Sequence, residues 1–274
     1  MSAPVAAATR RADPGRRRLV PILRVVEHHV MVYRRTWRGT VFSTVLNPIL
    51  FLAAIGVGLG SFIDEVNPAG VDGVPYLVFL APGLLAGQAM NTGTFESTYP
   101  VMAGIRWLKT YVAMILAPLS PWHVAFGQLT WVGLRLVFGS IVFLAVMVAF
   151  GATDVPHAIA MLPVAVLTGL AFAAPIQAFS ATRKNDNAFA ALFRFVITPM
   201  FIFSGTFFPI SQLPDLIEWI AFVTPLWHGV ALSRAIATDT VDPAFAAVNL
   251  LVLTGFIVVG IAASVRTFTR KLAE

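Results

Sequence analysis

The sequence contains no cysteine and few charged residues. Cysteine is absent from all 274 positions, which excludes disulfide bonds, thiolate metal ligands and cysteine nucleophiles. Charged residues make up 12% of the chain and hydrophobic residues 58%, whereas an ordinary soluble domain has roughly 25% charged residues. A single soluble core of this length does not bury so much apolar surface, so we expect a lipid bilayer to be the solvent.

The short motifs of nucleotide and zinc chemistry are also missing. The chain has no G-x-x-x-x-G-K-[ST] phosphate loop, and its five histidines form no H-E-x-x-H zinc helix. Ser204 lacks a glycine-rich approach, which argues against an intramembrane serine protease. We therefore expect no catalytic residue, no metal and no cofactor on this chain, and we expect any ATP and Mg²⁺ to be held by a partner subunit.

Long apolar stretches dominate the rest of the chain. A helix that spans a bilayer needs about 20 apolar residues. Stretches of that length, bounded by charge, proline or glycine, occur at residues 41–62, 74–95, 124–150, 157–182, 188–208 and 244–265. The sequence therefore predicts an all-α membrane protein with six transmembrane helices.

Basic residues concentrate in alternate loops. They precede the first apolar stretch and follow the second, the fourth and the sixth, whereas the other loops carry acidic residues and a single arginine, Arg234. Lysine and arginine are retained on the cytoplasmic side of a membrane. This distribution predicts that both termini are cytoplasmic and that the protein resides in the inner, or plasma, membrane.

The chain before the first apolar stretch divides into two parts. Residues 1–20 are basic and are expected to form a disordered tail that meets anionic lipid rather than nucleic acid. Residues 21–39 are predicted to form an interfacial helix, because apolar side chains recur three and four positions apart. These side chains are Leu23, Val26, Val30, Tyr33 and Trp37. Such a helix is either an anchor that fixes the topology or a docking surface for a cytoplasmic partner.

The polar stretch at residues 96–111, between the second and third predicted spans, is too long for a tight turn. It predicts one short amphipathic helix on the cytoplasmic face. Trp107 and Tyr111 would share one face of it, and Arg106 and Lys109 would project toward the cytosol or a partner. A plain interfacial helix and a partner contact both fit this pattern.

The stretch at residues 208–234 is apolar, but Pro209, Pro214 and Pro225 interrupt it. Because proline breaks the helical ladder, two short helices that dip into the outer leaflet fit better than a seventh span. Irregular backbone at membrane depth survives only when it is buried in protein or lines a cavity. We therefore predict a re-entrant outer gate along the substrate path, formed by Phe207, Phe208, Pro209, Trp219, Phe222, Trp227 and His228.

Arg135 lies inside the third predicted span, where an ionised group is costly and indicates a possible function. Three interpretations stay open: Arg135 faces a polar cavity, pairs with Glu96, or extends toward the head groups with its apolar stem in lipid. The spans contain no chain of carboxylates, which argues against a proton-driven pump.

Two segments resemble the ABC-2 type permeases, the membrane subunits of a large class of ATP-binding-cassette exporters. Residues 94–118 look like the cytoplasmic coupling helix of that family and its flanks. Residues 203–234 resemble its fifth span and outer element, including Pro225-Leu226, His228 and Arg234 at family-like spacing. Within the family, both segments look most similar to permeases of nodulation-factor (lipo-oligosaccharide) export, which are related to the daunorubicin-type drug permeases.

The resemblance implies an ABC-2 type transmembrane domain over residues 21–274. It also implies a dimer of permease subunits, with a homodimer favoured, two copies of an ABC ATPase, and an amphipathic exported substrate: a lipid-linked saccharide, a glycolipid or a hydrophobic drug. An ATP-independent channel or secondary transporter is the alternative, and a membrane enzyme acting on lipid would need a polar catalytic cluster. The expected ATPase-coupling residues are Arg24, Glu27, Arg34, Arg35, Arg38, Glu96, Tyr99, Arg106, Trp107 and Lys109.

Overall fold

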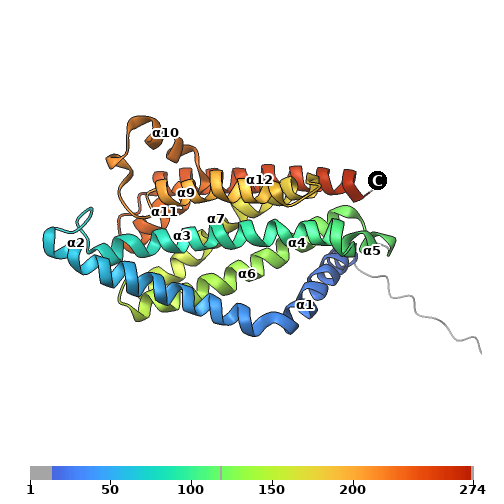
Figure 1. Ribbon diagram of the computed structural model, residues 1–274, viewed down its shortest axis with the longest axis horizontal. Coiled ribbons are helices and arrows are strands. Elements are labelled where there is room, and N and C mark those ends of the chain that lie inside the picture. Colours follow the sequence, from blue (N-terminus) through green and yellow to red (C-terminus); the bar gives the residue numbers. More distant parts are fainter. Residues whose placement is uncertain (1–13, 118, 273–274) are drawn as a thin grey trace, which may run out of the picture.

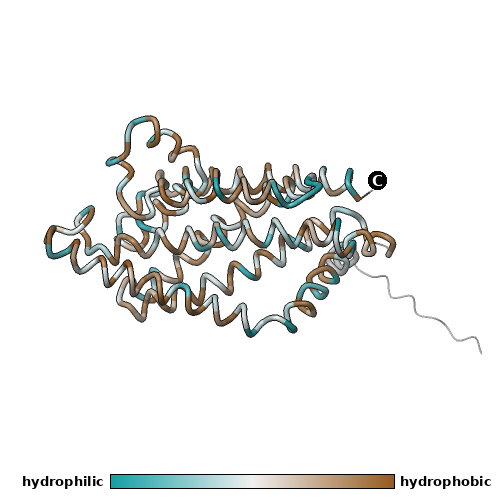
Figure 2. The backbone as a smooth tube through the Cα atoms, in the orientation of Figure 1, coloured by the Kyte–Doolittle hydropathy of each residue, from teal (hydrophilic) through white to brown (hydrophobic). Residues whose placement is uncertain are grey.

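The computed structural model of the protein describes residues 14–117 and 119–272. Within these two ranges every extended regular element is a helix, and the only β-type pairing is an isolated bridge between Val71 and Val74. The long helices run side by side along one axis (Figure 1), and hydrophobic residues predominate along them (Figure 2). The prediction of an all-α membrane fold is therefore confirmed for the described residues.

The first helical segment is longer than predicted. Helix α1 (Pro14–Phe51) continues directly into the π-helix η1 (Leu52–Leu59) and into α2 (Gly60–Val66). No break separates residues 21–39 from residues 41–62; α1 instead changes direction along its length (Figure 1), and its bend is hydrophilic (Figure 2). Of the expected disordered tail, residues 1–13 lie outside the described residues, and the chain is helical from Pro14.

Within the part of the chain that the structure describes, four helical segments are long and apolar enough to cross a membrane. They are Pro21–Val66, α6 (Pro121–Ala149), α7 (Val155–Thr182) and α12 (Pro243–Leu272). The helices α10 (Asp215–Val223) and α11 (Pro225–Ala237), bent by 86°, would add a fifth span only if the pair is counted as one broken span.

Two of the predicted spans do not meet this standard. The predicted second span is α3 (Tyr76–Ser97), which has 22 residues but is too polar. The predicted fifth span consists of α8 (Asn187–Leu192), η3 (Phe193–Ile197) and α9 (Thr198–Phe203), and together they form a shorter apolar helix. The count of six transmembrane helices therefore stays a prediction.

Helix α3 is largely covered by other helices. It packs against α6, α7 and α11, and Phe79, Leu80 and Met90 are completely buried. At Gly83 the approach is so close that an added Cβ atom would lie 2.9 Å from the backbone oxygen of Thr206. A helix enclosed in this way does not need an apolar surface toward lipid.

The loop before α6 forms two short helical pieces rather than one helix. The first consists of α4 (Tyr99–Met102) and the π-helix η2 (Ala103–Trp107), and the second is α5 (Thr110–Leu116). Lys109, at a φ of 53°, separates them, because this left-handed conformation ends a right-handed helix. The predicted shared face is therefore wrong: the Trp107 side chain is 54% exposed, whereas Tyr111 is 1% exposed.

The segment between α9 and α12 contains the two predicted short helices. A 3-10 turn, η4 (Ile210–Gln212), precedes α10, and Thr224 caps the first turn of α11 by accepting a hydrogen bond from the Trp227 amide. Helix α10 stands apart from the long helices at the end of the molecule that also carries α2 (Figure 1). We call this end the α10 end. The opposite end, the α5 end, carries α5 and the last turn of α12.

Candidate functional site

An ion pair and a cation–π contact of the same arginine join three helices near the α5 end. The Nε atom of Arg135, in the middle of α6, lies 3.1 Å from the Oε1 atom of Glu96, the next-to-last residue of α3. The side chains are only 13% and 18% exposed, respectively. The guanidinium carbon also lies 4.7 Å from the centre of the Tyr33 ring on α1. Of the three interpretations that the sequence left open for Arg135, the structure shows two: Arg135 pairs with Glu96, and it also lines a polar cleft.

A buried amide extends this contact to α5. Gln128, on α6, accepts a 2.8 Å hydrogen bond from the Tyr111 hydroxyl and donates a 2.9 Å hydrogen bond to the backbone oxygen of Glu96. Burial raises the pKa of Tyr111, so its hydroxyl stays a neutral donor. These contacts connect α5, α6 and the end of α3 through polar groups that are shielded from solvent.

Stacked rings hold α1 against the same region. The ring of His29 stacks on Trp131 at a centroid distance of 5.7 Å, and Tyr33 meets Trp131 edge-on at 5.6 Å. His29 also lies 6.3 Å from the ring of Tyr111. Ring contacts of this kind add about 0.5–1.5 kcal/mol each beyond burial. We call Tyr33, Glu96, Tyr111, Gln128 and Arg135 the junction cluster.

A polar cleft of about 620 Å³ lies beside the junction cluster, between α1, α3 and η3. Glu96 and Arg135 both line it. The rest of its lining is mainly hydroxyl and amide side chains, which include Thr40, Ser43, Asn47, Gln88, Asn91 and Thr92. Gln88, Asn91 and Thr92 belong to α3 and contribute to its polar character, and the whole set offers hydrogen bonds to a polar ligand.

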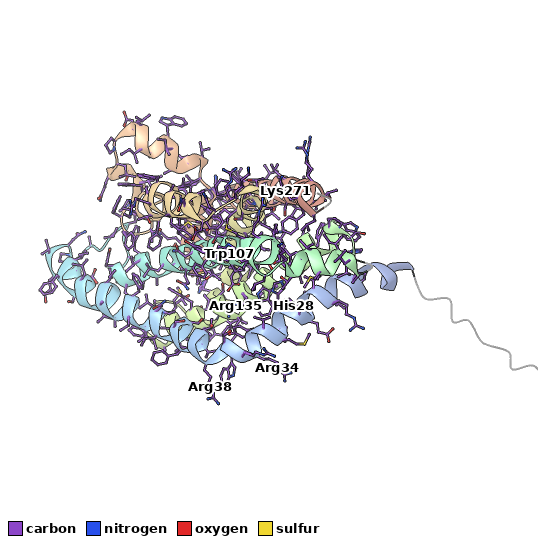
Figure 3. All side chains as sticks on the ribbon, turned by 45° about the vertical axis from the view of Figure 1, so that its right-hand side comes forward. His28, Arg34, Arg38, Trp107, Arg135 and Lys271 are labelled. Atoms are coloured by element: carbon purple, nitrogen blue, oxygen red, sulfur yellow. The ribbon has the colours of Figure 1, made fainter. Side chains whose placement is uncertain are left out.

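The predicted coupling residues divide between this site and the surface. Glu96 belongs to the junction cluster, and the ring of the partly buried Tyr99 lies 5.1 Å from that of Phe189. Figure 3 shows Arg34 and Arg38 at the edge of the molecule on α1, whereas Arg135 lies inside the bundle. The remaining predicted residues are exposed: Arg24 and Glu27, which pair at 3.3 Å, together with Arg35, Arg106, Trp107 and Lys109.

Part of the predicted outer gate comes together at the start of α11. The rings of Trp227 and Phe222 meet edge-on at 4.6 Å. His228 is buried, with its Nδ1 atom 2.7 Å from the Asn249 side-chain oxygen and its Nε2 atom 3.0 Å from the Phe222 carbonyl. Trp219 stays exposed on α10. Phe207, Phe208 and Pro209 are partly buried in the turn that follows α9.

Arg234 fastens the same region to α3, a role that the sequence did not reveal. Its Nε atom donates to the Phe79 carbonyl at 3.1 Å, and its Nη2 atom donates to the Gly205 carbonyl at 2.7 Å. Its guanidinium carbon lies 3.7 Å from the centre of the Phe79 ring. A cavity of about 650 Å³, lined in part by Pro209, Trp227 and Arg234, lies between these elements.

Sequence reasoning missed Gln128, His29 and Trp131. A buried amide in an otherwise apolar helix was the available signal for Gln128, because such a group must find hydrogen-bond partners. Among residues 14–117 and 119–272, no group of three or more metal-ligating side chains gathers. The features that distinguish this region are therefore a buried polar network and an adjoining cleft.

Comparison with known proteins identifies the family. The ABC-2 type transporter family matches residues 22–238. Nodulation protein J of Rhizobium leguminosarum bv. trifolii is 31% identical over 214 residues, which cover 76% of this chain and 80% of the relative. Nodulation protein J of Bradyrhizobium diazoefficiens is 27% identical over 248 residues, covering 90% and 92% of the two chains.

A relative outside that group also matches. The inner membrane transport permease YadH of Escherichia coli is 22% identical over 200 residues, or 73% of this chain and 75% of the relative. Members of the matched family are membrane components of transporters that work with a separate ATPase and are not ATPases themselves. The chain belongs to the ABC-2 type transporter family, and it is an integral membrane component of a transporter.

Proposed function

We propose that this chain is the permease subunit of an ABC exporter that moves an amphipathic substrate outward with ATP hydrolysed by a separate ATPase subunit. The observation that carries the proposal is the junction cluster. It links α5 to α6 and to the α3 wall of the polar cleft through polar contacts of 2.8 to 3.1 Å, and it reaches the α1 wall through the 4.7 Å contact of Arg135 with the Tyr33 ring.

The ATPase contact in this proposal is the α5 end. Arg106, Trp107 and Lys109 are exposed there on and beside η2, and the exposed Arg24 and Glu27 lie on the first part of α1. An exposed tryptophan flanked by cations suits a protein partner, because tryptophan and arginine are enriched in interfaces. Both described ends of the chain lie at this end (Figure 1), which accords with cytoplasmic termini in the plasma membrane.

The force path runs through the junction cluster. A displacement of α5 moves Tyr111, and with it Gln128 and the backbone of Glu96. Glu96 then pulls on Arg135, whose guanidinium lies against Tyr33 of α1. Buried polar contacts are stiff because the low local dielectric strengthens them. The displacement of α5 therefore changes the separation of α1 and α3, which are two walls of the cleft.

The substrate path in this proposal begins at the cleft and ends at the outer aromatic group around Trp227. Hydroxyl and amide groups of the cleft suit a polar head group. The rings of Phe222 and Trp227 suit acyl chains or flat aromatic rings. In this proposal a second copy of the chain completes the path in a homodimer bound to two ATPase subunits.

A double variant at the α5 end tests the proposal. The complex is purified with its ATPase and reconstituted in liposomes, and export of a fluorescent phospholipid is measured per ATP hydrolysed. Arg106→Gln with Trp107→Ala should lower this ratio at least tenfold at unchanged protein level, because the ATPase loses its contact with η2 and no longer displaces α5. Leu116→Ala, which alters an exposed apolar residue of α5, serves as the matched control. Unchanged coupling in the double variant would contradict the proposed ATPase contact.

The alternative function, an ATP-independent channel or secondary transporter, makes the opposite prediction. Such a protein moves its cargo without an ATPase and is indifferent to substitutions on the surface of η2. Flux through liposomes that contain this chain alone, with no nucleotide, would favour the alternative.

A further inference from the structure

A second groove, separate from the polar cleft, lies on the other side of Arg135. It encloses about 480 Å³ between α1 and α6. Apolar side chains form most of its walls: Val30, Trp37 and Val41 from α1, and Leu134 and Phe138 from α6. Trp37, Leu134 and Phe138 are exposed large hydrophobic residues, so the groove opens outward. In an integral membrane protein such an opening faces lipid.

Two donor atoms in this groove are buried and lack hydrogen-bond partners. One is the Nη1 atom of Arg135, whose Nε atom is used by Glu96. The other is the hydroxyl of Tyr33. A buried donor left unsatisfied costs about 1–3 kcal/mol, and more when the group is charged. Both residues line the groove, so an acceptor bound there would remove this cost.

The charges of the groove favour an anion. Arg34 lines its rim, and Arg135 lies inside the bundle (Figure 3). The neighbouring carboxylate of Glu96 pairs with Arg135 and neutralises that one cation, so the positive charge of Arg34 remains. A phosphate group offers several acceptor oxygens to guanidinium and phenol donors.

The groove extends beyond its two arginines toward the α10 end. Val41 and Phe138 lie further along their helices, toward the α10 end, than Arg34 and Arg135 do. The two helices run in the same direction away from the α5 end (Figure 1). The groove therefore continues from its two arginines along an apolar wall toward the middle of the bundle, while Val30 and Trp131 line it on the side nearer the α5 end. Trp37 and Trp131 lie near the two arginines, as tryptophan does at the level of lipid head groups.

We propose that this groove binds one phospholipid with an anionic head group, such as phosphatidylglycerol. Its phosphate accepts from Arg34, Arg135 and the Tyr33 hydroxyl, and one acyl chain follows the apolar wall formed by Val41, Leu134 and Phe138. The inference rests on the proposed function only in placing the α5 end on the cytoplasmic side, which makes the lipid one of the inner leaflet. The bound lipid holds α1 against α6 beside the junction cluster.

Retention of single lipids by the full purified chain tests this proposal. Native mass spectrometry from detergent compares the binding of phosphatidylglycerol with that of phosphatidylcholine. We expect at least fivefold tighter binding of phosphatidylglycerol. Arg34→Gln should reduce that preference about fivefold, the effect of one basic residue near an anionic head group. Arg35→Gln removes the same charge from a neighbouring position that does not line the groove, and it should change the preference less than twofold.

Tyr33→Phe and a fluorescence measurement locate the lipid within the groove. The variant keeps the ring beside Arg135 but removes the unpartnered hydroxyl, so binding of phosphatidylglycerol should weaken severalfold while the chain stays folded. Brominated phosphatidylglycerol should quench tryptophan fluorescence more than brominated phosphatidylcholine does. Trp37→Phe should reduce this excess, because Trp131 still lines the groove, whereas Trp219→Phe, at the other end of the molecule, should leave it intact.

Two results would overturn the lipid site. Equal retention of the two lipids excludes recognition of an anionic head group, and equal losses in Arg34→Gln and Arg35→Gln indicate a diffuse basic surface instead. These measurements need neither ATPase nor ATP. A complex that exports its substrate without preferring phosphatidylglycerol would therefore refute the lipid site alone. A chain that binds phosphatidylglycerol selectively but transports without an ATPase would refute the proposed function alone.

Discussion

The ion pair between Glu96 and Arg135 should contribute far more to stability than the exposed ion pair between Arg24 and Glu27. At a separation of about 4 Å and an effective dielectric constant of about 20, two unit charges attract by about 4 kcal/mol. The Glu96 and Arg135 side chains are 18% and 13% exposed, so desolvation offsets part of this attraction. The contact of Arg135 with Tyr33 adds about 0.5–1 kcal/mol.

Removing one partner leaves the other charge mostly buried. We therefore expect Glu96→Gln to lower the free energy of unfolding by about 2–4 kcal/mol, near the lower end of the range for breaking a buried pair. Arg135→Met should have a similar effect. The double variant should be more stable than the sum of the two losses implies, which gives a coupling energy of about 1–3 kcal/mol.

Unfolding of the purified chain in mixed micelles, followed by circular dichroism, measures these differences. The same cycle on Arg24 and Glu27 is the matched control, because both side chains are exposed and such pairs contribute about 0.2–1 kcal/mol. Coupling between Glu96 and Arg135 no larger than in this control would refute the reasoning that these two charges hold α3 to α6.

Three further changes have defined outcomes in the same unfolding assay. Tyr111→Phe removes the hydroxyl that donates to the buried side-chain oxygen of Gln128 on α6 and should cost about 1–2 kcal/mol; no loss would mean that the contact is unimportant. Gly83→Ala should cost about 1–3 kcal/mol by overpacking, whereas Gly139→Ala, where an added Cβ meets nothing within 4 Å, should cost nothing. The backbone N–H of His157 holds the pKa of Asp154 below its ordinary 3.8, so this stabilisation is complete above that pH and is lost as the pH falls below it. In Asp154→Asn the melting temperature should therefore fall less steeply as the pH is lowered through the acidic range. An unchanged slope would contradict the role given to Asp154.

The sequence predicted those helices best that are long and apolar. The stretch at residues 124–150 corresponds to α6 (Pro121–Ala149), and the stretch at 157–182 corresponds to α7 (Val155–Thr182). Periodic or continuous hydrophobicity over so many residues leaves few alternatives. The two short helices after α9 were predictable from proline positions, because Pro225 begins α11 and proline is favoured in a first turn.

The sequence did not predict where local and distant contacts override composition. Hydroxyls in the polar part of α1 donate to carbonyls one turn earlier, as Thr44 does to Thr40. Such bonds often bend a helix without ending it, and α1 continues through the boundary that the sequence predicted. Lys109 adopts a left-handed conformation that lysine rarely shows, and this separates Trp107 from Tyr111. The sequence showed that an ionised Arg135 inside a span is energetically costly. That its partner is Glu96, 39 residues away, depends on how α3 and α6 pack.

We propose that this chain obtains its energy from an ABC ATPase bound at the α5 end. The direct test is outward movement of a fluorescent phospholipid across liposomes that contain the chain, measured with and without an ABC ATPase partner. Transport should require both the ATPase and hydrolysable ATP. Equal transport by the chain alone, in the absence of nucleotide, would contradict the account.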